Sequence, residues 1–330
     1  MLKIVLLFST LTQKQKIYLN YFIKIAIVGL AFFYVFKKVS HQKNLLQFQK
    51  LIEKINPTTM KTILVLIVFL MFVNWFLEVW KWMILSRKIQ KLSFWSATKS
   101  VFSGLTWAIF TPNRIGEYGG RVMMMERGVR AKAAVAMGVG LFAQLVLTSV
   151  AGSLSIAWFV SAYLNPPGSI LLAVWMLAVI YGAGFLILYF NVQWVEVWVG
   201  KFKFLSKIKT FFSVLEDFKT RELAEVLLIS LLRFLIFTSQ YIILMQVILP
   251  SLPFIPMLLM IFILFFIQSA LPSLDLFDFS VRSFVASNLY SYITDQEIAV
   301  MAIVSCIWFV NLILPAIIGS VFVLRTNYLK

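Results

Sequence analysis

The sequence predicts an all-α integral membrane protein, a polytopic bundle of about six spanning helices plus two broken helical segments, or eight spans if those are counted. Three observations predict this fold. Of 330 residues, 61% are hydrophobic and 13% charged, whereas about a quarter of a soluble domain is charged. Several stretches lack charge over the roughly 20 residues that cross about 30 Å of hydrocarbon. Backbone in lipid must be paired internally, and no strand-like alternation appears, so we expect helices.

Six apolar stretches are expected to span the bilayer. They are 17–36, 62–85, 133–160, 170–190, 223–249 and 299–324. The first ends in Lys37 and Lys38 without a small-residue cleavage site, so it is expected to stay as a helix rather than be removed as a signal peptide. The regions 98–125 and 254–293 are apolar but interrupted by polar residues near their middles. No polar stretch could form a soluble core, so residues 1–330 are predicted to form a single membrane domain.

The net charge of +17 comes from basic residues that flank the apolar stretches. This placement favours contact with anionic lipid headgroups over nucleic acid. The loop 200–221 is rich in lysine, whereas the loops 161–169 and 249–257 carry no charge, so we expect the first loop and the C-terminus to be cytoplasmic. Segment 37–61 holds six lysines, which favours the cytoplasmic side, but the order of the predicted spans puts it on the outer side. The side of the membrane on which it lies is therefore left open. Its pattern suits an amphipathic helix on the membrane surface. The composition suits a bacterial cytoplasmic membrane.

One polar segment interrupts the region 98–125, and it runs from Phe110 to Arg121. A proline that breaks a helix and glycines that permit turns and close approach are combined here with three charges. The candidate hinge residues are Pro112, Gly116, Gly119 and Gly120, and the candidate binding residues are Arg114, Glu117 and Arg121. One interpretation is a re-entrant segment whose arginines bind a lipid phosphate. The other is an ordinary surface loop that fixes orientation.

A second polar segment, 268–282, interrupts the region 254–293. Pro272 is followed by Asp275, Asp278 and Arg282, and proline and arginine are ten residues apart here, against nine in the first segment. Paired interrupted segments in the two halves of a membrane protein indicate a transport site. The alternative is a chance similarity between two polar loops.

The second predicted span carries charge inside an apolar helix. Asn74, Glu78 and Lys81 lie four and three residues apart, so they share one face and the last two can pair. A charge inside a membrane helix costs about 3 kcal/mol, so these side chains are expected to face the protein interior or to snorkel. Arg233, about ten residues into its own span, could face the same cavity.

Trp80 and Trp82 are expected at the membrane interface, as aromatic-belt residues.

Several kinds of chemistry are not indicated by the sequence. The single His41 and the single Cys306 exclude a His-based metal cluster and a disulfide framework. There is no nucleotide-binding loop, dinucleotide fingerprint or nucleophile elbow. We therefore expect no cofactor.

The run Pro-x-Arg-x-Gly-Glu, from Pro112 to Glu117, followed by Arg121 and preceded by a Trp- and Lys-rich span, resembles the lysylphosphatidylglycerol synthase transmembrane-region family, also called the flippase-like domain family. The resemblance extends over about 17–324. It implies two re-entrant segments around a cavity and movement of a modified lipid between leaflets. Arg114, Glu117 and Arg121 match the first family motif.

The second segment departs from that family pattern. Relatives commonly have glycines and an Arg–Glu pair where this chain has Asp278, Phe279 and Arg282 followed by Ser283. Larger relatives fuse this region to an aminoacyl transferase or glycosyltransferase domain, which this chain is expected to lack.

Three functional hypotheses remain. The first is a lipid flippase, whose transport is passive or is driven by an ion gradient or by supply of the substrate. Its substrate would be an anionic phospholipid or polyprenyl-linked lipid that carries an amino acid or a sugar. Arg114, Arg121 and Arg282 would hold phosphate; Glu117, Asp275 and Asp278 would meet cationic or hydroxyl groups; Glu78, Lys81 and Arg233 complete the predicted substrate-binding set.

The second hypothesis is a membrane transferase in which Glu117 or Asp275 acts as general base. The third is a non-catalytic subunit that recruits a separate glycosyltransferase through the loop 201–221. The partners expected across these hypotheses are the membrane lipid, a separate glycosyltransferase or aminoacyl transferase, and a second copy of the chain in a homodimer.

Overall fold

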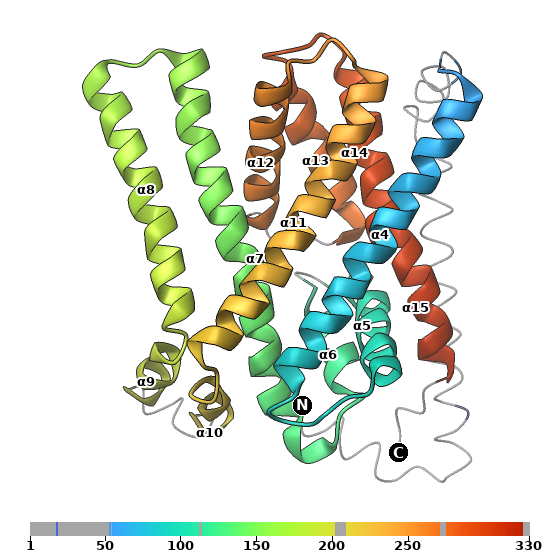
Figure 1. Ribbon diagram of the computed structural model, residues 1–330, viewed down its shortest axis with the longest axis vertical. Helices are drawn as coiled ribbons and strands as arrows, with labels where there is room; N and C mark the ends of the chain where they lie inside the picture. Colours follow the sequence, from blue (N-terminus) through green and yellow to red (C-terminus); the bar gives the residue numbers. More distant parts are fainter. Residues whose placement is uncertain are drawn as a thin grey trace.

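The computed structural model of the chain describes residues 55–111, 114–201, 209–270 and 275–325, together with Tyr18 and Glu53; the side chains of residues 209 and 275–281 are not among those described. The predicted span 17–36, most of the segment 37–61, Pro112 and Pro272 lie outside the described residues. Within them every regular element is a helix (Figure 1). The all-α prediction is confirmed for this part of the chain.

Five long helices are apolar enough to cross a membrane by length and composition. They confirm the predicted spans 62–85, 133–160, 170–190, 223–249 and 299–324. In order they are α4 (Pro57–Ser86), α7 (Arg130–Phe159) with a π-helical turn (Val160–Leu164), α8 (Gly168–Phe190), α11 (Thr220–Ile248), and α14 (Glu297–Trp308), which continues through a π-helical turn (Phe309–Ile313) into α15 (Leu314–Arg325). The short helices α9 (Trp194–Lys201) and α10 (Lys209–Phe212) lie between α8 and α11.

Capping residues explain where the first of these helices begins. The side chain of Asn56 accepts a hydrogen bond from the Thr58 backbone N–H at 2.9 Å, and Pro57, with no N–H of its own, occupies the first helical position. The π-helical turn in the last span has a similar local cause. Pro315 has no N–H to donate to the carbonyl of Asn311, four residues earlier, so the regular hydrogen-bond ladder is interrupted where the π turn lies.

The broken region 98–125 forms a helical hairpin. α5 (Phe94–Ile109) leads into the bundle and α6 (Ile115–Val122) returns beside it. The hydroxyl of Ser100 donates to the carbonyl of Arg121 at 2.9 Å, which ties the two ends together. A Cβ atom added to Gly120 would lie 2.6 Å from the Cα of Gly104, so the two helices meet at a spacing that only glycine allows.

The broken region 254–293 forms a second hairpin, from α12 (Phe254–Ala270) and α13 (Asp275–Tyr290). The hydroxyl of Tyr290 donates to the carbonyl of Met257 at 2.9 Å, so the end of α13 is tied to the start of α12. Figure 1 shows the two hairpins at opposite ends of the bundle, α5–α6 at the bottom and α12–α13 at the top. Residues close to both turns, Arg114 in one hairpin and Gln268 and Arg282 in the other, line one cavity.

The two tryptophans of α4 that were expected at the membrane interface differ in exposure. Trp80 is 51% exposed, and its position at the interface stays a prediction. The prediction for Trp82 is wrong, because its side chain is fully buried and its indole N–H donates to the hydroxyl of Ser100 at 3.1 Å. Trp82 lies one helical turn after Glu78, on the face of α4 that packs against α5, and tertiary packing therefore decides its environment.

Helix α8 differs from the other spans. Only Ala178, Gly182 and Tyr189 of its 23 residues are buried, and it stands at one edge of the bundle beside α7 (Figure 1). Its exposed side chains are apolar almost all round, which is the pattern of a helix surrounded by lipid.

Candidate functional site: a charged cavity in the helix bundle

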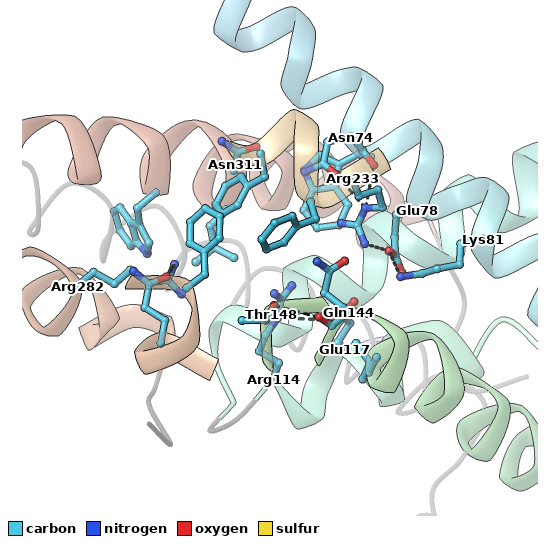
Figure 2. A pocket seen from close by; sticks show the side chains of 18 residues that line it. Asn74, Glu78, Lys81, Arg114, Glu117, Gln144, Thr148, Arg233, Arg282 and Asn311 are labelled. Atoms are coloured by element: carbon cyan, nitrogen blue, oxygen red, sulfur yellow. Dashed lines mark hydrogen bonds and ion pairs between the residues drawn. The ribbon is translucent and has the colours of Figure 1, made fainter. Parts of the chain in front are cut away.

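A cavity of about 250 Å³ lies among α4, α7, α11, the α14–α15 span and the turns of the two hairpins. One part of its wall is aromatic and apolar, and includes Trp75, Phe234, Phe237 and Phe265. The other part carries charged and amide side chains, most of which are labelled in Figure 2. A charged cavity inside an apolar bundle is a candidate binding site.

Glu78 of α4 is the centre of the charged cluster. Its Oε1 accepts a hydrogen bond from Nη1 of Arg121 at 2.7 Å, and its Oε2 lies 2.8 Å from Nζ of Lys81. Nη1 of Arg233, from α11, contacts the same Oε2. The predicted pairing of Glu78 with Lys81 is confirmed, and both side chains are buried. One carboxylate therefore holds three cations from three helices.

Glu117 of α6 is the second anionic centre. Its Oε2 lies 3.0 Å from Nε of Arg114, and its Oε1 accepts a hydrogen bond from Nη2 of Arg121. Arg121 thus bridges the two carboxylates and is only 2% exposed. It lies behind the cavity and does not line it, whereas the side chain of Arg114 is 39% exposed and faces the cavity.

Arg233 is held in place by α4. Its Nε donates to Oδ1 of Asn74 at 2.9 Å and to the Asn74 carbonyl at 3.2 Å, and its guanidinium carbon lies 5.4 Å from the ring centre of Trp75. The predicted position of Arg233 in the same cavity as Glu78 is confirmed. Its guanidinium is oriented by an amide, a carboxylate and an aromatic face, so its geometry does not depend on a ligand.

The described charges around the cavity do not balance. Five cationic side chains face two carboxylates, which leaves an excess of three positive charges; the cations are Lys81, Arg114, Arg121, Arg233 and Arg282. A net positive charge among the described side chains of a cavity inside an apolar bundle attracts an anion. The guanidinium of Arg282 donates to Oε1 of Gln268 at 2.9 Å on the far side of the cavity from Glu78 (Figure 2).

The turn of the first hairpin depends on an arginine rather than on a glycine. Arg114 has φ 57° and ψ 25°, the left-handed conformation, and no described glycine has positive φ. Gly116 is needed for close approach, since an added Cβ would lie 2.2 Å from the Trp107 carbonyl oxygen. Gly119 has open space where a Cβ would be. The close approach expected of the glycines is therefore confirmed at Gly116 and Gly120, while among the described residues of the turn the left-handed conformation falls on Arg114.

Three polar side chains of the cavity were not singled out from the sequence. Gln144 and Thr148 come from α7, and Asn311 comes from the π-helical turn before α15. Each is a polar residue in an otherwise apolar span, which is the signal that could have identified them. These residues belong to no common sequence motif, and they meet at the cavity because the helices that carry them are adjacent in the fold.

Several predicted site residues remain predictions. Asp275 and Asp278 lie in α13, but their side chains are not described. The hinge roles of Pro112 and Pro272 fall outside the described residues. In the described part of the chain, no group of three His, Cys, Asp or Glu side chains is arranged to hold a metal ion.

Comparisons of the chain with protein-family models, curated proteins and solved structures found no match. The chain is a helical membrane protein with about five candidate spans. Its resemblance to the flippase-like domain family stays a prediction that rests on the segment around Arg114, Glu117 and Arg121.

Proposed function

We propose that the chain binds the anionic headgroup of a membrane lipid in this cavity and moves the lipid between the two leaflets. The observation that carries the proposal is the excess of three positive charges among the described side chains around a cavity inside an apolar bundle. An anion that enters it exchanges water for fixed guanidinium groups. The barrier to translocation is the free energy of moving a polar headgroup into the hydrocarbon layer. A cavity of this kind lowers that free energy.

The arrangement of the hairpins supports transport rather than simple retention. The hairpins α5–α6 and α12–α13 come from opposite ends of the bundle, and residues near their turns share the cavity (Figure 1). We propose that both are re-entrant segments in the membrane. Interrupted helices that meet around a central site are typical of transporters, in which the site opens to either side in turn.

The proposal assigns different roles to the cations. Arg114, Arg233 and Arg282 line the cavity and would hold the phosphate, together with Lys81. Arg121 would not touch the lipid; it would fix Glu78 and Glu117, which in turn orient the other cations. This assignment differs from the sequence-based hypothesis, in which Arg121 binds phosphate directly.

The cavity is large enough for a headgroup and not for a whole lipid. Its 250 Å³ corresponds to about eight water molecules at about 30 Å³ each. The acyl chains would have to remain in the bilayer, next to the aromatic wall that includes Phe234 and Phe237. We propose a bacterial cytoplasmic membrane as the location, with the basic loop 200–221 on the cytoplasmic side, and an amino-acid- or sugar-modified lipid or lipid carrier as the substrate class.

Translocation in proteoliposomes tests this function. Purified protein would be reconstituted with a headgroup-intact anionic phospholipid that is fluorescent on one acyl chain, and the outer leaflet would be quenched with dithionite. We expect the wild type to make the inner-leaflet label accessible and Arg114→Asn to slow this by about tenfold, because one charge-assisted contact is lost.

Asparagine is chosen because it tolerates the left-handed conformation of residue 114. Lys99→Asn removes one exposed positive charge away from the cavity and serves as the matched control. Equal rates for protein-free liposomes and the wild type would refute transport. Equal rates for wild type and Arg114→Asn would refute the role of the cavity.

A further inference from the structure

We infer that the lipid headgroup bound in this cavity is a phosphodiester that carries an uncharged, hydroxyl-bearing group of the glycerol or sugar type, and not an ammonium group. This inference rests on the proposed function and narrows its substrate. It follows from which groups around the cavity are already paired and which are not.

The carboxylates near the cavity are fully engaged by the protein's own cations. Glu78 contacts Lys81, Arg121 and Arg233. Glu117 contacts Arg114 and Arg121. An ammonium group entering the cavity would meet no described carboxylate that lacks a cation, and it would approach an excess of positive charge. Like charges repel more strongly in the interior of a protein, where the dielectric constant is lower than in water, so the described residues select against a cationic headgroup.

Four buried polar atoms on residues that line the cavity have no hydrogen-bond partner among the described residues. They are the donors Nε1 of Trp75 and Nε2 of Gln268, and the acceptors Oε1 of Gln144 and Oδ1 of Asn311. Buried polar groups are nearly always paired in folded proteins, so unpaired ones in a cavity indicate a ligand or ordered water. All four belong to uncharged side chains, and the group that satisfies them is therefore polar without needing a charge.

Existing hydrogen bonds fix which atom of two amides is available. Oε1 of Gln268 already accepts from Arg282 at 2.9 Å, which leaves the Nε2 donor. Nδ2 of Asn311 already donates to the Ile307 carbonyl at 3.1 Å, which leaves the Oδ1 acceptor. A hydroxyl group both donates and accepts, so adjacent hydroxyls can satisfy a donor and an acceptor together. A phosphate oxygen can only accept and an ammonium can only donate.

The free amides lie beside the cations. Gln268 is hydrogen-bonded to Arg282, and Figure 2 shows Gln144 between the group of Glu78 and Arg233 and the pair of Arg114 and Glu117. A phosphate held by these arginines would therefore place its next few atoms against the amides. A glycerol or sugar attached through the phosphate has hydroxyls at that reach, and the cavity of about 250 Å³ has room for both parts.

The test compares three lipids with identical acyl chains, titrated onto the detergent-purified full chain and counted by native mass spectrometry. Phosphatidylglycerol has the phosphate and hydroxyls, phosphatidic acid has the phosphate alone, and lysyl-phosphatidylglycerol adds two ammonium groups. We expect phosphatidylglycerol to bind at least about tenfold more tightly than lysyl-phosphatidylglycerol. Gln144→Leu should weaken phosphatidylglycerol about fivefold and leave phosphatidic acid unchanged, whereas Gln268→Leu, which also removes the acceptor of Arg282, should weaken both lipids.

Gln240→Leu is the matched control, because Gln240 is also a buried glutamine of a spanning helix but donates to the Ile67 carbonyl and does not line the cavity. Equal or tighter binding of lysyl-phosphatidylglycerol would overturn the inference, and so would a Gln144→Leu variant that weakens phosphatidylglycerol and phosphatidic acid alike or neither. A different result would show that the proposed function itself is wrong: Arg114→Asn would then bind phosphatidic acid as tightly as the wild type.

Discussion

The two helical hairpins have similar sequence patterns and contribute differently to the cavity. In α5–α6 the helices touch through Gly104 and Gly120, and the charges of Glu117 and Arg121 are paired inside the protein. In α12–α13 the described polar groups at the cavity are Gln268 and Arg282, and the amide of Gln268 keeps a free donor. The first hairpin is therefore a rigid charged support, and the second offers hydrogen-bonding groups.

The arginines that end the two motifs make this difference concrete. Arg121 follows its proline by nine residues and Arg282 follows its own by ten. Arg121 is 2% exposed and bridges two carboxylates behind the cavity wall, whereas Arg282 lines the cavity and is only partly buried. Similar spacing thus gives one arginine that stabilises the fold and one that is placed to meet a ligand.

The largest expected effect comes from exchanging each of these arginines for glutamine. Arg121→Gln removes the cation that joins Glu78 to Glu117 and should lower the free energy of unfolding by about 3–5 kcal/mol, because buried charges lose their partner. Arg282→Gln should lower it by less than about 1 kcal/mol, since the residue is partly exposed and water can solvate the groups that it contacts. Denaturant unfolding in detergent, followed by circular dichroism, measures both.

Equal stability losses in the two arginine variants would remove the distinction between the hairpins. A second readout separates the roles further, since Arg282→Gln should lose lipid binding while it keeps the melting curve of the wild type.

A smaller effect is expected at the contact between α5 and α6. Gly120→Ala places a methyl group 2.6 Å from the Cα of Gly104, so the helices must separate, and we expect a loss of about 1–3 kcal/mol. Gly119→Ala is the control in the same helix. It meets nothing within 4 Å and should stabilise the helix by up to about 1 kcal/mol. The thermal midpoints of the two variants should move in opposite directions, and a shift of both in the same direction would contradict the close packing.

The smallest effect concerns two serines of α5. Ser100 accepts from Trp82 and donates to the Arg121 carbonyl, so it links α4, α5 and α6. Ser100→Ala should cost about 1–2 kcal/mol, because two buried hydrogen bonds are lost. Ser103 is equally buried, but its hydroxyl has no partner among the described residues, and Ser103→Ala should be close to neutral. Indistinguishable melting curves for the two variants would show that the Ser100 bridge adds no stability.

The sequence predicts those parts of the site that follow from helical spacing. The shared face of Asn74, Glu78 and Lys81 is a local property of one helix, and the structure confirms the ion pair. The five described spans follow from hydropathy, and the two broken regions from proline and charge. Arg233 could be placed because a charge within a span must be paired or face a polar cavity.

The remaining features depend on tertiary packing. Trp82 is buried because α5 covers that face of α4, and Arg121 is removed from the cavity because carboxylates of two different helices meet it. The left-handed turn falls on Arg114 although glycines lie nearby, since Gly116 is required against Trp107. Gln144 and Asn311 join the site only through the folded arrangement of α7 and the last span.

The most direct measurement of the central claim is the identity of the lipid that remains on the protein after gentle extraction from its own membrane, determined by native mass spectrometry and lipidomics. The wild type and the Lys99→Asn control should retain one anionic lipid far above its share of the membrane, and Arg114→Asn should lose most of it. The same bulk phospholipids on all three proteins would contradict a headgroup site in the cavity, and would leave these arginines with a role in the fold and in topology alone.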